Sequence, residues 1–114
     1  MLINKEEFRE TFKPFDKEIV VEIIDIFIQE WPERRDQIRK NIGEGDFDSL
    51  RFNAHSLKGV VANFIAEAPK DLAKILEDNA KEKVDDDNMD IFLQMEEQIN
   101  QLISELEEIR KEYL

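Results

Sequence analysis

Apolar side chains recur along most of the chain at spacings of three and four residues, the period of an amphipathic helix. The most regular example runs from residue 92 to residue 113. Its apolar positions alternate between intervals of three and four residues: Phe92, Met95, Ile99, Leu102, Leu106, Ile109 and Tyr113. This pattern predicts a long helix with one continuous apolar face.

A second helix is predicted over residues 17–30, and the same apolar period continues beyond Pro32 to Ile42. Its period is carried by Val20, Ile23, Ile24, Phe27, Trp31, Arg35, Ile38 and Ile42. Further apolar residues widen the stripe, as expected of a helix with neighbours on two sides: Ile19, Val21, Ile26 and Ile28. Pro32 is expected to kink this helix or to start a new one. The glycines of Gly43-Glu44-Gly45 are expected to end it.

Two shorter helices are predicted in the middle of the chain. The first begins at Asp46 or Asp48 as its N-cap. Its stripe is Phe47, Leu50, Ala54, Leu57, Val61 and Phe64. A break is expected near residues 66–68, because Pro69 suits the first turn of a new helix. The stripe of that next helix is Leu72, Ile75, Leu76 and Ala80.

The N-terminal residues predict a short helix that Asn4 caps and that Pro14 interrupts, with Phe8 and Phe12 on one side. Together these patterns predict an all-α fold. The expected arrangement is an antiparallel up-down four-helix bundle with the short N-terminal helix packed on it. At this length residues 1–114 are expected to form one domain.

Composition and charge narrow the possible functions. The chain has no cysteine and one histidine, which excludes disulfides, thiol nucleophiles and Cys/His zinc sites, and favours the cytoplasm. The 16 basic and 28 acidic residues give a net charge of −12, which would repel nucleic acids and anionic membranes. No Gly-rich phosphate loop, catalytic carboxylate pair or Ser–His–Asp set is present. We therefore expect no cofactor, no metal and no catalytic activity of its own.

Two alternatives arise near the last helix. Asp86, Asn88, Asp90 and Glu97 have the 1, 3, 5 and 12 spacing of an EF-hand calcium loop. However, Ile91 occupies the position that needs glycine, so a helix cap with solvated acids is favoured. The heptad pattern also suits an intermolecular coiled coil, but a bundle helix requires the same stripe. A monomer is expected.

His55 is the candidate for chemistry. On a helical wheel it lies roughly 130° from the centre of the stripe of its helix, so it is expected to face solvent. The surrounding residues 49–66 include Arg51 and Lys58 but no carboxylate, although acids make up 28 of the 114 residues overall. On an acidic protein, a patch that has basic residues and no carboxylates favours a role for His55 in binding an anion or carrying one covalently.

Two neighbours of His55 also point to a binding surface. Gly59 costs about 1 kcal/mol relative to alanine within a helix, yet it lies beside the histidine on the outward face. The close approach of a partner's backbone would require a glycine there. Phe52, about 170° from the stripe, is expected to place an aromatic ring on the same outward face.

The segment Ala54-His55-Ser56-Leu57-Lys58-Gly59 resembles the A-H-x-L-K-G signature of histidine phosphotransfer (HPt) domains. Further similarity lies in Asn63-Phe64-Ile65-Ala66, which resembles N-L-G-A, and in the L-A-x-x-L-E pattern of residues 72–77. Phe27 and Pro32 fit the F-x-x-x-x-P of the preceding helix. The resemblance covers residues 16 to about 80. The last helix resembles the family only in being a helix of the same type.

The resemblance implies that His55 accepts a phosphoryl group on Nε2 and exchanges it with the aspartate of a receiver domain or with a histidine kinase. It implies that Lys58 supplies positive charge and that Glu77 accepts a hydrogen bond from Nδ1, which fixes the tautomer. A partner-docking surface is expected at Arg51, Phe52, Gly59, Ala62 and Lys81. The expected partners are a response-regulator receiver domain and a sensor or hybrid histidine kinase.

Other interpretations of the same residues remain open at this stage. The alternative function is a helical docking module that is never phosphorylated and that binds a partner through Phe52, His55 and Gly59. Glu77 and Lys81 have the spacing of an ordinary i,i+4 surface ion pair. Ile65 and Pro69 stand where the family usually has glycine and leucine, which predicts a reshaped turn between the two central helices.

Overall fold

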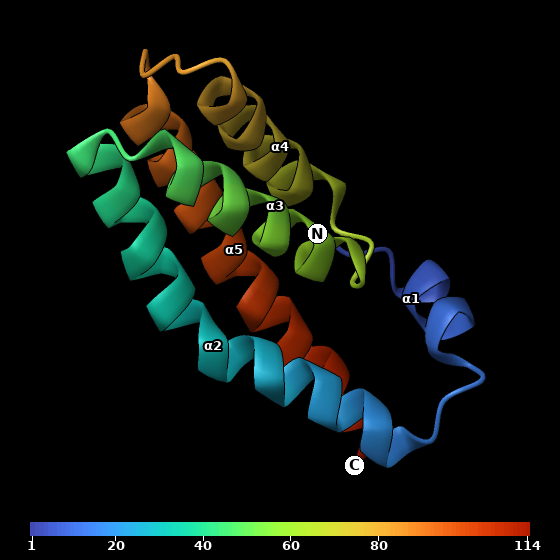
Figure 1. Ribbon diagram of the computed structural model, residues 1–114. Helices are drawn as coiled ribbons and strands as arrows, with labels where there is room; N and C mark the ends of the chain where they lie inside the picture. Colours follow the sequence, from blue (N-terminus) through green and yellow to red (C-terminus); the bar gives the residue numbers. More distant parts are fainter.

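The computed structural model describes all 114 residues and contains five α-helices, one short 3₁₀ turn and no β-strand. The elements are α1 (Lys5–Phe12), α2 (Lys17–Glu44), α3 (Phe47–Ala62), α4 (Glu67–Lys81), α5 (Asn88–Arg110) and η1 (Lys111–Tyr113). From α2 to α5, successive helices run in alternating directions along a molecule 42 Å long and 21 Å wide (Figure 1). The predicted all-α fold is confirmed.

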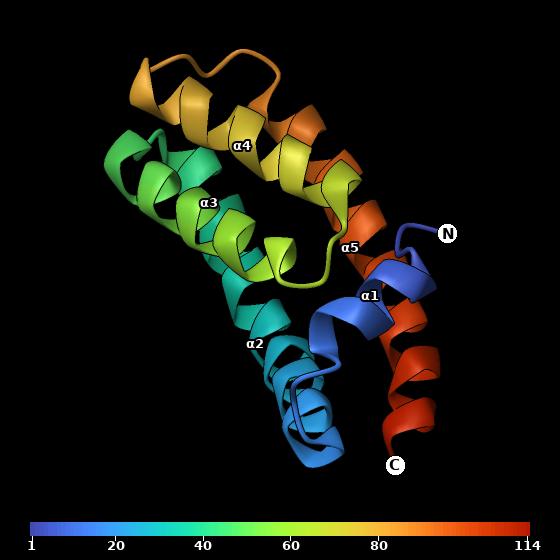
Figure 2. The same ribbon diagram turned by 90° about the vertical axis from the view of Figure 1, so that its right-hand side faces the viewer.

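Helix α2 packs against α3 and α5, and helix α4 also packs against α3 and α5. The pair α3 and α4 forms the most extensive contact, and it covers one half of the longer helices α2 and α5 (Figure 1). The short helix α1 lies beside the other half of α2 and α5 (Figure 2). No helix combines the length and the apolar run needed to cross a bilayer.

The predicted apolar stripes form most of the core. Leu50, Ala54, Leu57 and Val61 of α3 are at most 1% exposed. All the predicted stripe residues of α5 are buried except Tyr113 of η1, which is half-buried. A single cluster of 23 buried apolar residues results, to which every helix contributes.

Three apolar residues were wrongly placed on core faces. Ile75 is 43% exposed, and the neighbouring Ala73 takes the buried position on α4 instead. Ile19 and Ile26, expected to meet a second neighbour of α2, are 41% and 46% exposed. On α4, the burial of Ala73, Leu76 and Ala80 turns Ile75 toward solvent. On α2, the physical reason is that α3 and α4 are shorter than α2 and cover only part of it (Figure 1).

The helix ends largely follow the predicted signals. The side chains of Asn4 and Asp46 accept the backbone N–H groups of Glu7 and Ser49 and so cap α1 and α3. Gly45 ends α2 in the left-handed conformation, with φ 65°. Pro32 does not start a new helix, because α2 continues through it without a break. Pro32 is exposed, so water can reach this part of the backbone.

A buried carboxylate fastens the start of the chain to α5. Glu105 is only 8% exposed, and its two oxygens accept the backbone N–H groups of Leu2 and Ile3, each at 2.9 Å. Phe8 and Phe12 of α1 are buried against the same end of the molecule. The N-terminal segment is thereby held where it covers apolar surface of the longer helices.

Three residues other than glycine adopt positive φ: Ile65, Lys83 and Asp87, at 60°, 57° and 62°. Ile65 thus adopts the left-handed conformation that suits glycine, the usual residue there, so the backbone at this position gives no sign of the predicted reshaping of the turn. Lys83 ends α4 in a Schellman motif, since its N–H binds Ala80 O and the N–H of Val84 binds Asn79 O. Lys83 is exposed, so its side chain contributes no burial.

Replacing Lys83 with glycine should therefore stabilise the protein. Glycine adopts positive φ without a steric penalty, and we expect a gain of about 0.5–1 kcal/mol in the free energy of unfolding for Lys83→Gly. Urea denaturation followed by circular dichroism measures this difference. Lys83→Ala is the matched control and should show no such gain. Equal stability of the glycine and alanine variants would contradict the assignment of this helix end.

Candidate functional site

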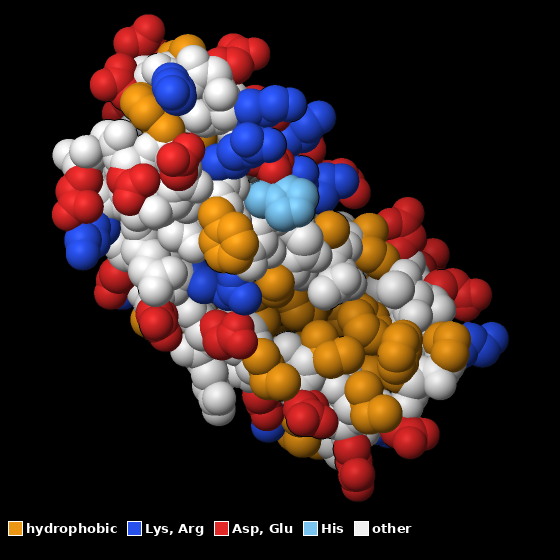
Figure 3. All heavy atoms as spheres, in the orientation of Figure 1, with side chains coloured by type: hydrophobic (Ala, Val, Ile, Leu, Met, Phe, Trp, Pro, Cys, Tyr) orange, Lys and Arg blue, Asp and Glu red, His pale blue; other side chains and the backbone are white.

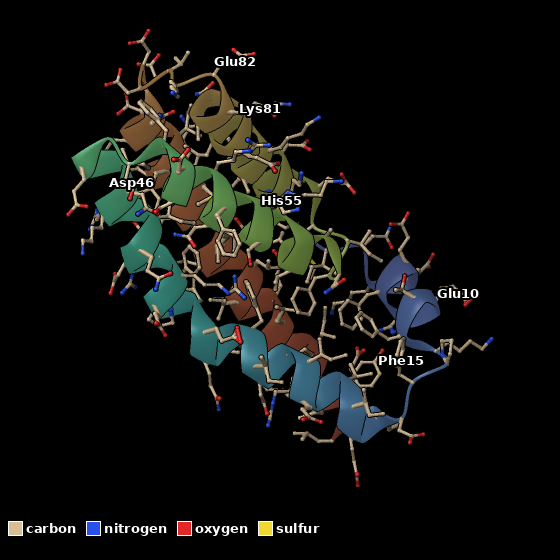
Figure 4. The ribbon with its side chains drawn as sticks, viewed as in Figure 1. Glu10, Phe15, Asp46, His55, Lys81 and Glu82 are labelled. Carbon is tan, nitrogen blue, oxygen red and sulfur yellow. The ribbon has the colours of Figure 1, made fainter.

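His55 lies in the middle of α3 and projects into solvent. Its side chain is 68% exposed, which confirms the outward direction predicted from the helical wheel. The ring faces a shallow pocket of about 400 Å³ that is lined by Asp48, Arg51, Phe52, His55 and Glu77. Figure 4 shows His55 on the outer side of α3, on the face that α3 shares with α4. The ring is therefore accessible to another molecule.

The carboxylate of Glu77, which extends from α4, is shared by two residues of α3. Its Oε2 lies 2.5 Å from Nδ1 of His55, and its Oε1 lies 2.6 Å from Nζ of Lys58. The predicted contact between Glu77 and Nδ1 is thus present. The alternative surface pair between Glu77 and Lys81 is wrong, because Lys81 makes no ion pair within 4.0 Å.

The electrostatics of this group fix the state of the imidazole. Burial acts to raise the pKa of Glu77, which is 14% exposed, but hydrogen bonds from Lys58 and His55 outweigh it. The pKa is held below the ordinary value of 4.5, so the carboxylate is charged at neutral pH. A charged carboxylate only accepts hydrogen bonds, so Nδ1 of His55 must carry the proton. The lone pair of a neutral ring is then on Nε2.

Polar contacts on the opposite side hold α3 against α2. Asn53 donates a hydrogen bond to Asn41 at 2.8 Å, and Arg34 donates one to the hydroxyl oxygen of Ser56 at 2.9 Å. Asn41 is buried, whereas Arg34 also pairs with Glu30 on the surface. These positioning contacts were not found from the sequence, because no local motif relates residues of α2 to residues of α3.

The residues expected to dock a partner occupy different parts of the surface. Phe52 is 73% exposed beside His55, and Arg51 is exposed and makes no ion pair within 4.0 Å. Gly59 is exposed, and a Cβ atom added there would meet nothing within 4 Å. Ala62 is exposed at the end of α3, whereas Lys81 stands at the end of α4 (Figure 4).

An apolar groove begins where α3 ends. Phe12, Phe15, Ile23, Ala62 and Ile65 line it, together with Thr11 and Asn63. Figure 3 shows the histidine between this broad apolar area on one side and a group of Lys and Arg side chains on the other. The incompletely covered part of α2 therefore adds its apolar side chains to the face that carries His55.

Of the residues of the alternative calcium loop, Asn88 has a structural role, and Asp86, Asp90 and Glu97 are exposed. Asn88 is 1% exposed, accepts a hydrogen bond from Asn79 and donates one to the carbonyl of Val84. These bonds close the connection between α4 and α5. No group of three His, Asp or Glu side chains has a geometry that could hold a metal ion.

The geometry predicts the tautomer of His55. In the native protein, ¹⁵N NMR above the titration range of the ring should show a protonated Nδ1 and an unprotonated Nε2. In Glu77→Ala, which removes the acceptor, the ring should shift toward the Nε2–H form. Glu82→Ala is a matched control on the exposed surface just after α4 and should leave the ring signals unchanged. Identical ring signals in the native protein and Glu77→Ala would contradict the assigned hydrogen bond.

The comparisons with known proteins assign the family. A family model described as the Hpt domain matches residues 22–111, from α2 to η1, and so includes the last helix as well as the His55 segment. Neither a curated protein nor a solved structure matches the chain significantly. Hpt domains are phosphocarriers that interact with kinases and receiver domains in phosphorelays. Because the match covers most of the chain and contains His55 and its partners on α3 and α4, this protein belongs to the Hpt domain family.

Proposed function

We propose that this protein is a phosphoryl carrier in a two-component phosphorelay and that His55 is its phosphoacceptor. One observation carries the proposal: His55 is 68% exposed, and its Nδ1 is bound to a largely buried carboxylate, that of Glu77, while Nε2 is left free. An ordinary surface histidine has no reason to be oriented in this way. A core histidine would be buried.

The proposed reaction needs little from the protein beyond this orientation. The lone pair of Nε2 attacks the phosphorus of a receiver's aspartyl phosphate, and an N–P bond forms. The P–O bond to the aspartate breaks, and its electron pair returns to the carboxylate. Nδ1–H keeps its hydrogen bond to Glu77, which stabilises the positive charge that develops on the ring. The reverse sequence returns the phosphoryl group to a receiver.

Lys58 supplies positive charge in this proposal, and its contact with Glu77 indicates how. The ion pair at 2.6 Å balances the negative charge of the carboxylate that supports His55. Without Lys58, an uncompensated carboxylate would face an incoming phosphoryl group that is itself negative. Lys58 thus lowers electrostatic repulsion at the site.

The proposed partners are a receiver domain and a sensor or hybrid histidine kinase. We propose that a receiver docks over Phe52, Gly59 and Ala62 and extends across the apolar groove at the end of α3. This groove adjoins His55 on the same face, so one partner can cover both (Figure 3). Lys81 and Arg51 are exposed cations, which suits acidic groups around the partner's aspartate.

We also propose a domain organisation, an oligomeric state and a location for the protein. We infer that residues 1–114 form one domain in which α2 to α5 are the antiparallel four-helix bundle of an HPt protein. The protein would act as a monomer in the cytoplasm, without a cofactor or a nucleotide site of its own.

The phosphoacceptor is tested with His55→Gln. The native protein should acquire a phosphoryl group from a phosphorylated receiver, and the bond should be acid-labile and base-stable. His55→Gln should acquire none, yet its free energy of unfolding should change by less than about 0.5 kcal/mol, because the side chain is exposed. Native protein that stays unlabelled by a panel of receivers but still binds one would favour the non-phosphorylated docking module. Undiminished labelling of the variant would reject His55.

The docking surface is tested at Gly59. Since an added Cβ meets nothing, Gly59→Ala should gain up to about 1 kcal/mol of helix stability. Gly59→Arg should fold and react normally with the small donor phosphoramidate, but its exchange with a receiver should fall sharply, because the side chain holds the two proteins apart. Stopped-flow transfer assays compare the variants. Native exchange rates in Gly59→Arg would place the docking surface elsewhere.

A further inference from the structure

We propose that Arg51 binds the phosphoryl group carried on His55 Nε2. This inference rests on the proposed function and assigns a phosphate-binding residue within it. Two observations point to Arg51: its guanidinium has no ion-pair partner, and it lines the same pocket as the exposed face of the His55 ring. The lysine expected to supply positive charge, Lys58, already has its Nζ on Glu77.

Helix geometry places Arg51 on the correct side of the ring. Side chains of an α-helix lean toward its N-terminus, so the side chain of His55 leans over the turn that contains Arg51 and Phe52. The rise along the helix axis from Arg51 to His55 is about 6 Å, which the long arginine side chain can span. Lys58 lies on the other side, one turn toward the C-terminus.

The orientation of the His55 ring places Nε2 away from Glu77 and favours Arg51 as the residue next to Nε2. Nδ1 faces α4 through its contact with Glu77, so Nε2 points away from that carboxylate. A phosphoryl group on Nε2 brings two negative charges into the pocket. Among the residues that line the pocket, only Arg51 is permanently cationic. Its planar fork of N–H groups can hold two phosphoryl oxygens at once.

The other residues of the pocket are consistent with this role. Of the α3 residues that line the pocket, Asp48 is the furthest from His55 along the helix. It lies one turn before Arg51 and forms no ion pair with Arg51 within 4.0 Å. Phe52, at 73% exposure, flanks the pocket with an apolar ring. Contact with an apolar surface reduces the exposure of the phosphoryl oxygens to water and strengthens the interaction with the guanidinium.

The experiment uses phosphoramidate, so that docking of a receiver plays no part. In the reaction the lone pair of Nε2 attacks phosphorus, the P–N bond of phosphoramidate breaks, and its nitrogen leaves as ammonia. Arg51→Gln should react about five- to tenfold more slowly than the native protein, and Arg51→Lys should recover part of the rate. Lys40→Gln removes an equivalent unpaired charge from α2 and should react at the native rate.

The contact itself is measured by NMR. On phosphorylation of the native protein, the Nε–Hε signal of the Arg51 guanidinium should shift strongly, and the same treatment of His55→Gln should not move it. The ring signals of unphosphorylated Arg51→Gln should match the native ones, because the Nδ1 contact is intact. An Arg51 signal that does not move on phosphorylation would overturn the inference, whatever the rates. Failure of the native protein to become phosphorylated at all would instead overturn the proposed function.

Discussion

The carboxylate of Glu77 has two partners on the neighbouring helix, and the arrangement of the site depends on this sharing. One oxygen accepts the proton of His55 Nδ1, and the other binds the ammonium of Lys58. The first contact orients a ring that is otherwise exposed and leaves Nε2 unprotonated when the ring is neutral. The second balances the charge of the carboxylate, so that an anion can approach the histidine.

This arrangement requires α3 to be fixed relative to α4, and the packing provides that. Leu50, Ala54, Leu57 and Val61 are buried, so α3 cannot rotate without exposing apolar surface. On the opposite side, hydrogen bonds from Asn53 to Asn41 and from Arg34 to Ser56 join α3 to α2. His55 therefore stands on a rigid helix between two neighbours, although its own side chain is in solvent. A rigid support of this kind favours in-line transfer between two proteins.

Much of the fold could be predicted because each helix has its own apolar period and its own cap signals. The face that carries His55 followed from the same period, since an outward residue is defined by the inward ones. The period does not reveal whether another helix is long enough to cover a face, which is why Ile19 and Ile26 were placed wrongly. One apolar residue of α2, Ile23, lines the groove that we propose for docking.

Contacts between distant residues could not be predicted from local pattern alone. The pairing of Glu77 with His55 was expected only through the family resemblance, since 22 positions separate them. The bond from Arg34 to Ser56 and the capture of the N-terminal backbone by Glu105 had no sequence signal. In each case the two residues meet because their segments pack against each other, and the sequence pattern of one helix does not specify which segment packs against it.

The most direct test of the account is to find which ring nitrogen carries the phosphoryl group. After phosphorylation of ¹⁵N-labelled protein, the coupling between ³¹P and the ring nitrogens of His55 identifies the bonded atom. The account predicts a bond to Nε2, with Nδ1 still hydrogen-bonded to Glu77. A phosphoryl group on Nδ1, or on any residue other than His55, would contradict it.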